Sequence, residues 1–207
     1  MNEHAMPKAF EIEERDAIRR ALMHHGLKRF AQAGIRAARI DDICRDVGIA
    51  KGSFYAFFPS KEDLFMAIVE EREALHREDM IGFLTRAPAH ADTSAAQFFD
   101  KIMTQIETDP VLNIVLANGE IPHLRRKLGD ERFAAGQRAD LEFALEAAAL
   151  WSKGNGRPQL SGDDLLALLT VMLSVASQRQ NMTPDQYGPA VGILRQLFIT
   201  RLTGITA

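Results

Sequence analysis

The chain has 207 residues, of which 46% are hydrophobic and 26% charged, and its formal net charge at pH 7 is −3. This composition excludes wholesale disorder and allows one large domain, or a small domain beside a larger one. The single cysteine, Cys44, excludes an internal disulfide, and the longest apolar run, residues 165–176, is too short to cross a bilayer. Because the first ten residues also lack the apolar run of a signal peptide, we expect a cytoplasmic protein without a membrane span.

Almost every segment shows the periodicity of a helix, and none shows convincing strand alternation, so we predict an all-α fold. Capping signals and breakers place the helix ends. The capping signals are Ser60 with Asp63, Ser94 with Gln97, Asp109 before Pro110, Ser161 with Asp164, and Thr183 with Gln186, and Gly34 ends the first helix. The predicted helices cover about residues 11–33, 40–46, 50–57, 61–84, 94–107, 110–119, 122–128, 130–152, 161–180 and 185–203.

Residues 39–58 are predicted to form two short helices joined by a tight turn at Gly48. Cys44 and Gly48 are small and close in sequence, which lets the two helices approach each other. The apolar residues fall where two crossed short helices need them; they are Ile40, Ile43, Val47, Ile49 and Phe54. This pattern is typical of a helix-turn-helix, whose second helix lies in the DNA major groove.

Charge is distributed unevenly along the chain. Residues 15–61 hold ten lysines and arginines against four aspartates, a local charge of +6 on an acidic chain. Such a segment fits a footprint for DNA phosphates, and it equally fits a solvated helix surface.

Residues 15–65 resemble the N-terminal DNA-binding domain of the TetR family of transcriptional regulators. The run KGSFYAFFPSKEDL, residues 51–64, is the most specific part, and the resemblance covers about a quarter of the chain. It implies a three-helix DNA-binding head over residues 11–65 and a larger helical ligand-binding and dimerisation domain over residues 66–207. The matching residues are Phe30, Gly34, Ile40, Asp42, Ile43, Gly48, Ile49, Lys51, Gly52, Ser53, Tyr55, Phe57, Phe58, Ser60, Lys61, Glu62, Asp63 and Leu64.

The candidate DNA contacts lie on or beside the two short helices. A long cation at the start of the second helix reaches a phosphate or a guanine edge, and a glycine there allows close backbone approach. Hydroxyl groups bond a base edge or a phosphate, and a lysine in the first turn of the next helix lies where free N–H groups favour phosphate. Asp41 either accepts from cytosine N4 or only repels phosphate. The candidates are Arg36, Arg39, Asp41, Lys51, Gly52, Ser53, Tyr55 and Lys61.

The stretch departs from the family pattern at three positions. Arg39 and Ala50 stand where the family usually has Ser or Thr as helix caps, and a lost cap costs about 1 kcal/mol. Phe57 stands where a second Tyr or His is common and cannot donate to phosphate, so we expect it in the core.

In the C-terminal domain, the resemblance implies a cavity for a small effector. Aromatic and sulfur side chains with a few polar groups suggest a mainly apolar or aromatic ligand, although ordinary core packing explains each residue as well. The candidates are Phe99, Met103, Asn113, Asn118, His123, Phe143, Trp151 and Met172.

The last two helices, about residues 161–180 and 185–203, are apolar over more than half of their circumference. A helix apolar over so wide an arc needs cover on two sides. We expect a second copy of the chain to supply one side, in a homodimer; complete burial within one subunit is the alternative.

The sequence carries no motif for catalysis, a cofactor or a metal. His24 and His25 are adjacent on a helix and cannot chelate one ion together, and the other histidines lack ligand partners at suitable spacing. We therefore expect no enzyme, but a ligand-released repressor that binds a pseudo-palindromic operator as a dimer. A small-molecule-binding helical dimer with weak or lost DNA binding is the alternative, and a helical enzyme is a third hypothesis.

Overall fold

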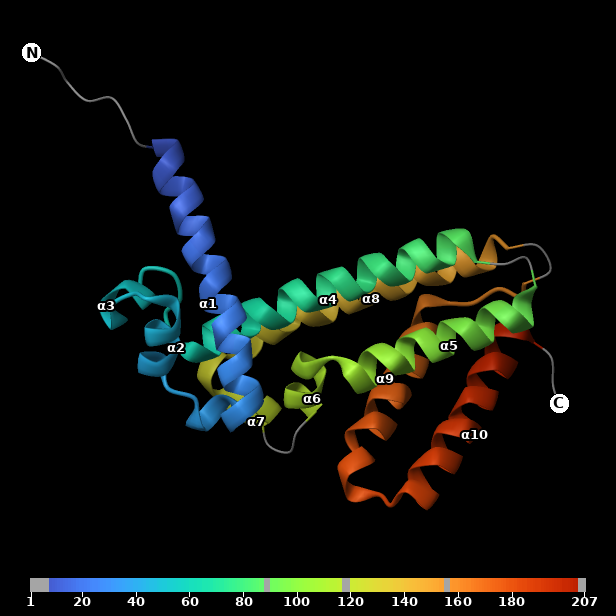
Figure 1. The fold of residues 1–207 in the computed structure, drawn as a ribbon. Coiled ribbons are helices and arrows are strands. Elements are labelled where there is room, and N and C mark those ends of the chain that lie inside the picture. The colour runs from blue at the N-terminus through green and yellow to red at the C-terminus, as the bar shows by residue number, and fades with distance from the viewer. Residues whose placement is uncertain (1–7, 88–89, 117–119, 155–156, 205–207) are drawn as a thin grey trace, which may run out of the picture. The chain divides into compact units, whose positions relative to one another are not determined.

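The computed structural model describes residues 8–87, 90–116, 120–154 and 157–204. Every regular element in these residues is helical, which confirms the predicted fold class (Figure 1). The chain divides into two compact units, Met1–Glu71 and Arg72–Ala207, and both this division and the predicted one at residues 65 and 66 fall inside α4. The elements are α1 (Lys8–Ala37), α2 (Ile40–Val47), α3 (Lys51–Phe54), α4 (Lys61–Arg86), α5 (Ala91–Thr108), α6 (Pro110–Leu116), α7 (Glu120–Leu128), α8 (Asp130–Ser152), α9 (Gly162–Ser177), a 3-10 turn (Arg179–Asn181) and α10 (Pro184–Thr203).

The N-terminal unit is built from α1, α2, α3 and the first part of α4. Gly34 interrupts α1 with a φ of 76°, at the predicted end of the first helix. Gly48 ends α2 with a φ of 81°, and its N–H donates to the carbonyls of Cys44 and Arg45. The fully buried side chains of this unit form its core; they are Leu22, Phe30, Ile35, Ile43, Phe54, Leu64 and Phe65.

The prediction of a second short helix over residues 50–57 is wrong in length. α3 ends at Phe54, and residues 55–57 form a turn. The N–H of Phe57 donates to the carbonyl of Phe54 at 2.9 Å, a three-residue spacing that tightens the chain. Phe58 precedes Pro59, which disfavours a helical residue at that place. Phe58 is buried, whereas Phe57, which was expected in the core, is only half-buried.

The C-terminal unit surrounds one apolar core, with α8 packed against α9 and α5 against α10. Its largest fully buried side chains include Trp151, Phe98, Phe99 and Phe198. Phe198 contacts both phenylalanines, with ring centroids 5.9 and 5.5 Å away, so α10 is held to α5 by aromatic packing.

Most predicted caps are confirmed by hydrogen bonds. The Asp109 carboxylate accepts from the Val111 N–H, the Ser161 hydroxyl from the Asp164 N–H, and Thr183 with Gln186 forms a complete capping box. The predicted cap at Ser94 is wrong, because α5 begins at Ala91 and the buried Ser94 hydroxyl accepts from Arg157 instead. α7 likewise begins before the predicted Pro122, at Glu120.

No helix among the described residues is long and apolar enough to cross a membrane. Both α9 and α10 keep apolar side chains on their surface. The exposed fraction is 47% for Val171, 65% for Ile193 and 59% for Leu197. The two helices therefore carry more apolar surface than this unit itself covers.

Candidate functional site

Four of the residues predicted to contact DNA lie on the exposed surface of α3 and the turn that follows it. Lys51, Gly52, Ser53 and Tyr55 are exposed, whereas Phe54 between them is fully buried and anchors the turn. A Cβ added at Gly52 would meet nothing within 4 Å, so packing inside the protein does not require a glycine there. The missing side chain leaves room for a partner outside the chain.

Asp41 and Lys51 are both candidate contacts, and the structure pairs them with each other. The Lys51 Nζ lies 3.1 Å from Oδ1 and 3.2 Å from Oδ2 of Asp41. Both side chains remain about half exposed, at 54% for Lys51 and 42% for Asp41. The pair therefore links α2 to the first residue of α3 while leaving the ammonium accessible.

Lys61 closes the end of the first helix instead of pointing freely outward. Its Nζ donates to the carbonyl of Arg36 at 2.6 Å and to that of Ala38 at 2.9 Å. An ammonium has three donors, so one remains for a phosphate oxygen. The side chains of Arg36 and Arg39 are exposed on either side of this junction.

Neither α2 nor α3 has a side-chain cap, as predicted from Arg39 and Ala50. In place of a cap, a charge-assisted ion pair between α1 and α2 stabilises α2. The Arg29 guanidinium donates to both Asp46 oxygens at 2.7 Å, and this hydrogen bonding lowers the pKa of the Asp46 carboxyl. Sequence reasoning missed this bridge, because the two residues stand on different helices.

Two further arginines hold the turn after α3. The Arg15 guanidinium lies over the Phe57 ring, 5.0 Å from its centroid, and donates to the Ala56 carbonyl. Arg19 lies over the Phe58 ring at 5.1 Å. Some of the basic side chains of residues 15–61 therefore stabilise the turn and do not contribute to a free basic surface.

The predicted ligand residues do not line one cavity. Phe99, Met103, Trp151 and Met172 belong to the packed core, and the Trp151 Nε1–H donates to the Leu202 carbonyl. The structure thus places these four in the core rather than on a cavity wall.

The other four predicted ligand residues are scattered. His123 is buried on α7 and Asn113 is exposed on α6, whereas Asn118 lies outside the described residues. Of the eight, only Phe143, on α8, lines the mainly apolar cavity described below.

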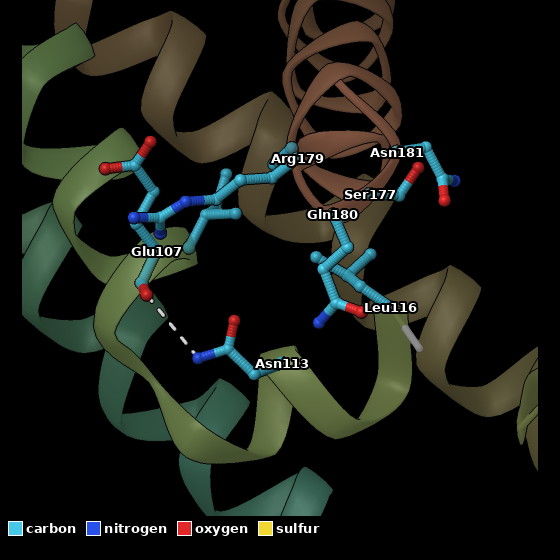
Figure 2. Close-up of a pocket in the computed structure, with 9 residues that line it drawn as sticks. Glu107, Asn113, Leu116, Ser177, Arg179, Gln180 and Asn181 are labelled. Atoms are coloured by element: carbon cyan, nitrogen blue, oxygen red, sulfur yellow. Dashed lines mark hydrogen bonds between the residues drawn. The ribbon is translucent and has the colours of Figure 1, made fainter. Parts of the chain in front are cut away.

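Asn113 lines a small polar pocket with Glu107, Arg179 and Gln180 (Figure 2). The Asn113 side-chain amide donates to the backbone carbonyl of Glu107, whose carboxylate accepts from the Tyr187 hydroxyl at 2.9 Å. Burial and the Glu107 carboxylate raise the pKa of Tyr187 to about 12. The pocket volume is about 40 Å³, room for water but not for an effector.

A second cavity, open and about 210 Å³ in volume, lies among α4, α5, α6, α8 and α9. Its wall is mainly apolar, with a polar edge from α4 and α8. The apolar lining residues are Met80, Ile102, Ile106, Leu112, Phe143, Leu166, Leu169 and Leu173, and the polar ones are Glu73, His76, Arg77, Gln105, Asp140 and Thr170. Sequence reasoning found only Phe143 of this set, because residues on five helices meet there.

Asp109 accepts hydrogen bonds from two side chains of α4, one of which, His76, lines this cavity. Its carboxylate is buried, caps α6, and accepts from the guanidinium of Arg72 and from His76 Nε2 at 2.7 Å. Burial works to raise the pKa of Asp109, but the hydrogen bonds from Arg72, His76 and the backbone outweigh it and lower the pKa. Across the ranges that the structure describes, no group of three or more His, Cys, Asp or Glu side chains could hold a metal ion.

Comparison with known proteins finds similarity between the head and one family. Residues 18–68 match the sequence profile of bacterial regulatory proteins of the tetR family. The Uncharacterized HTH-type transcriptional regulator YuxN of Bacillus subtilis (strain 168) is 38% identical over 48 residues, which make up 23% of this chain and 16% of that protein. The match thus spans only about a sixth of the relative's length.

Solved structures share the fold over most of the chain. The reduced form of NemR from E. coli superposes with a TM-score of 0.69 at 16% identity, covering 91% of this chain and 100% of that one. FadR from Bacillus subtilis, in complex with stearoyl-CoA, gives a TM-score of 0.58 at 18% identity, covering 90% and 99%. At these identities the similarity establishes the fold alone. The sequence of residues 18–68 is therefore similar to the tetR family of bacterial regulatory proteins, and the chain as a whole shares its fold with solved transcriptional regulators.

Proposed function

We propose that the chain is a transcriptional regulator whose N-terminal head binds double-stranded operator DNA. The observation that carries this proposal is the exposed face of α3 in a tetR-family head: Lys51, Ser53 and Tyr55 face solvent while Phe54 holds the turn in the core. The ammonium and hydroxyl groups suit phosphate oxygens and base edges, and Gly52 admits the DNA backbone.

The DNA-binding species in this proposal is a homodimer formed through α9 and α10. The exposed side chains of Val171, Ile193 and Leu197 support it, because a second copy would cover this apolar surface. A two-fold axis would bring the same two helices together from each copy and build a four-helix contact. Two heads would then bind half-sites of a pseudo-palindrome, about one helical turn or ~34 Å apart.

We further propose that a small effector in the C-terminal unit releases the operator, so that the protein acts as a repressor. The cavity of about 210 Å³, bordered by α4, supports this because α4 also begins in the head. By thermodynamic linkage, the operator would weaken effector binding by the same factor by which the effector weakens operator binding.

Selection of random DNA duplexes with the purified full-length protein tests the proposal. We expect an enriched palindromic consensus whose binding constant falls steeply as the salt concentration rises. Recovery of no enriched sequence would instead favour a small-molecule-binding dimer with weak or lost DNA binding. The pairing of Lys51 with Asp41 is the observation that favours this second candidate, because it neutralises a cation on α3.

A further inference from the structure

The mainly apolar cavity has room for one ring. Among its lining residues, Met80, Ile102 and Ile106 are buried, and Phe143 and Leu169 are half-buried. The cavity volume is about 210 Å³. An apolar cavity of roughly 150 Å³ is enough for benzene, so this one accommodates a single ring with a short substituent. A long acyl chain exceeds it.

The basic side chains of the lining, Arg77 and His76, already bond to acids. The Arg77 guanidinium donates from Nη1 to Asp140 Oδ1 at 2.8 Å, and its Nη2 lies 3.7 Å from Glu73 Oε2. His76 Nε2 lies 2.7 Å from the buried carboxylate of Asp109. A carboxylate only accepts, so Nε2 carries a proton and the bond exists for both the neutral and the charged ring. An anionic ligand would therefore have to share Arg77 or His76 with a carboxylate that repels it.

The acids of the lining, Glu73 and Asp140, are engaged in the same way. Both face the Arg77 guanidinium, and Glu73 has a further interaction within the protein. A cationic ligand would have to share these carboxylates with Arg77, whose positive charge repels it. Taking a charge from water into an apolar cavity costs free energy that only an available opposite charge restores. The lining therefore favours a ligand without a formal charge.

The neutral polar side chains of the lining, Thr170 and Gln105, offer hydrogen-bond acceptors. The Thr170 hydroxyl donates to the Leu166 carbonyl at 2.8 Å, which leaves its oxygen to accept. The Gln105 side-chain amide donates to the Asp79 carboxylate at 2.8 Å. Because a carboxylate only accepts, this contact identifies the N–H group of the amide, and the other polar atom is the carbonyl oxygen, an acceptor. A ligand with an O–H group matches these acceptors.

We infer that the mainly apolar cavity binds an uncharged single-ring alcohol or phenol, whose ring packs beside Phe143 and whose hydroxyl group donates to the Thr170 oxygen. This inference deepens the proposed function, on which it rests, because such a molecule would be the effector that releases the operator.

A titration followed by nuclear magnetic resonance tests the charge of the ligand. The full-length protein, isotope-labelled at its leucine and isoleucine methyl groups, is titrated at pH 7 with three ligands of similar size: 2-phenylethanol, phenethylamine and phenylacetate. We expect the alcohol to shift the methyl signals of Ile102, Ile106 and Leu112, which line the cavity. The alcohol should bind about tenfold more tightly than the cationic amine or the anionic acid, because neither charge finds an available partner.

Two threonine variants test the hydrogen bond. Thr170→Val removes the acceptor, keeps the branched shape of the side chain, and should weaken binding of 2-phenylethanol by roughly threefold to tenfold. Thr104→Val is the matched control and should bind like the natural protein. Thr104 is also exposed and also donates to the carbonyl four residues earlier, that of Asp100 at 2.7 Å, but it does not line the cavity. Equal affinities of the two variants would overturn the assignment of Thr170.

Either of two titration results would overturn the inference: the amine or the acid binding as tightly as the alcohol, or no shift of the cavity methyl signals by the alcohol. Leu169→Trp, which fills the cavity, should abolish binding of the alcohol, and a melting curve checks that this variant folds. Retained binding by the folded variant would place the ligand elsewhere.

Operator release is followed separately, by fluorescence anisotropy of labelled DNA. If the alcohol binds in the cavity but releases no DNA, the ligand class stands and the proposed release mechanism fails.

Discussion

The Lys51 ammonium lies 3.1 Å from the Asp41 carboxylate, so the first residue of α3 forms an ion pair with a side chain of α2. Because both side chains are about half exposed, the pair is screened by water and contributes little to stability. If Lys51 contacts phosphate as proposed, the neighbouring carboxylate of Asp41 would orient it and would also weaken non-specific attraction to DNA.

Asp41→Asn should strengthen binding to random duplex DNA severalfold and make the salt dependence steeper by about one counterion. The reason is that the amide leaves Lys51 uncompensated near the phosphates. Anisotropy titrations at several salt concentrations measure both quantities. Asp16→Asn, on the exposed surface of α1, is a charge-matched control, and an equal effect of the two variants would remove any special role for Asp41.

Lys51→Ala and Tyr55→Phe should each weaken operator binding by roughly tenfold. Each variant loses one contact to a phosphate or a base edge, and such a contact is worth about 1–3 kcal/mol. Both side chains are exposed, so thermal unfolding should change little. Gel-shift titration together with a melting curve separates the two effects. Unchanged operator binding by both variants would refute their assignment as contacts.

Lys61→Met should destabilise the head by about 1–2 kcal/mol, because the backbone carbonyls of Arg36 and Ala38 lose their donor. Urea unfolding at constant pH measures this change. Lys51→Ala provides the comparison: it removes a lysine that bonds no carbonyl in the described residues, so its midpoint should stay near that of the natural protein. Equal midpoints for all three proteins would contradict the structural role of Lys61.

Leu197→Glu should convert the dimer to monomers at micromolar concentration, since a charge at a side chain that is 59% exposed in one copy becomes costly once a second copy covers it. Light scattering during gel filtration gives the mass directly. The control, Gln97→Glu, changes an exposed residue of α5 by the same charge and should remain dimeric. A Leu197→Glu protein of unchanged mass would rule out this face of α10.

Asp109→Asn should destabilise the C-terminal unit by roughly 3–5 kcal/mol, because Arg72 and His76 lose the buried carboxylate that pairs with them. The pKa of Asp109 is lowered on folding, so its contribution is complete above the unfolded pKa of about 4 and is lost as the pH falls through the folded pKa. Urea unfolding between pH 2 and pH 7 should therefore show a weaker acid dependence in the variant. A parallel curve for variant and natural protein would mean that Asp109 is not the group responsible.

The fold of the head and its resemblance to a known family were predictable from local signals. Turn and cap residues act within a few residues of themselves, so their effect does not depend on distant packing. Examples are Gly48, Ser60 with Asp63, and Thr183 with Gln186. Ser94 shows the limit of such signals. Its hydroxyl accepts a hydrogen bond from Arg157, 63 residues away, and does not cap the helix.

The chemistry of both candidate sites was decided by tertiary structure. Lys51 meets Asp41 and Lys61 meets the end of α1 only because the helices of the head cross, across sequence separations of 10 and 25 residues. The same holds for the cavity, where Arg77 joins Asp140 on a helix 63 residues later. Periodicity identifies which residues are apolar, but it does not say which of them pack tightly, as Trp151 does, and which border a cavity, as Phe143 does. The sequence by itself determined that this is an all-helical chain whose head resembles the tetR family, whereas the pairing of its charges and the place of its cavity were decided by the packing of helices that are distant in sequence.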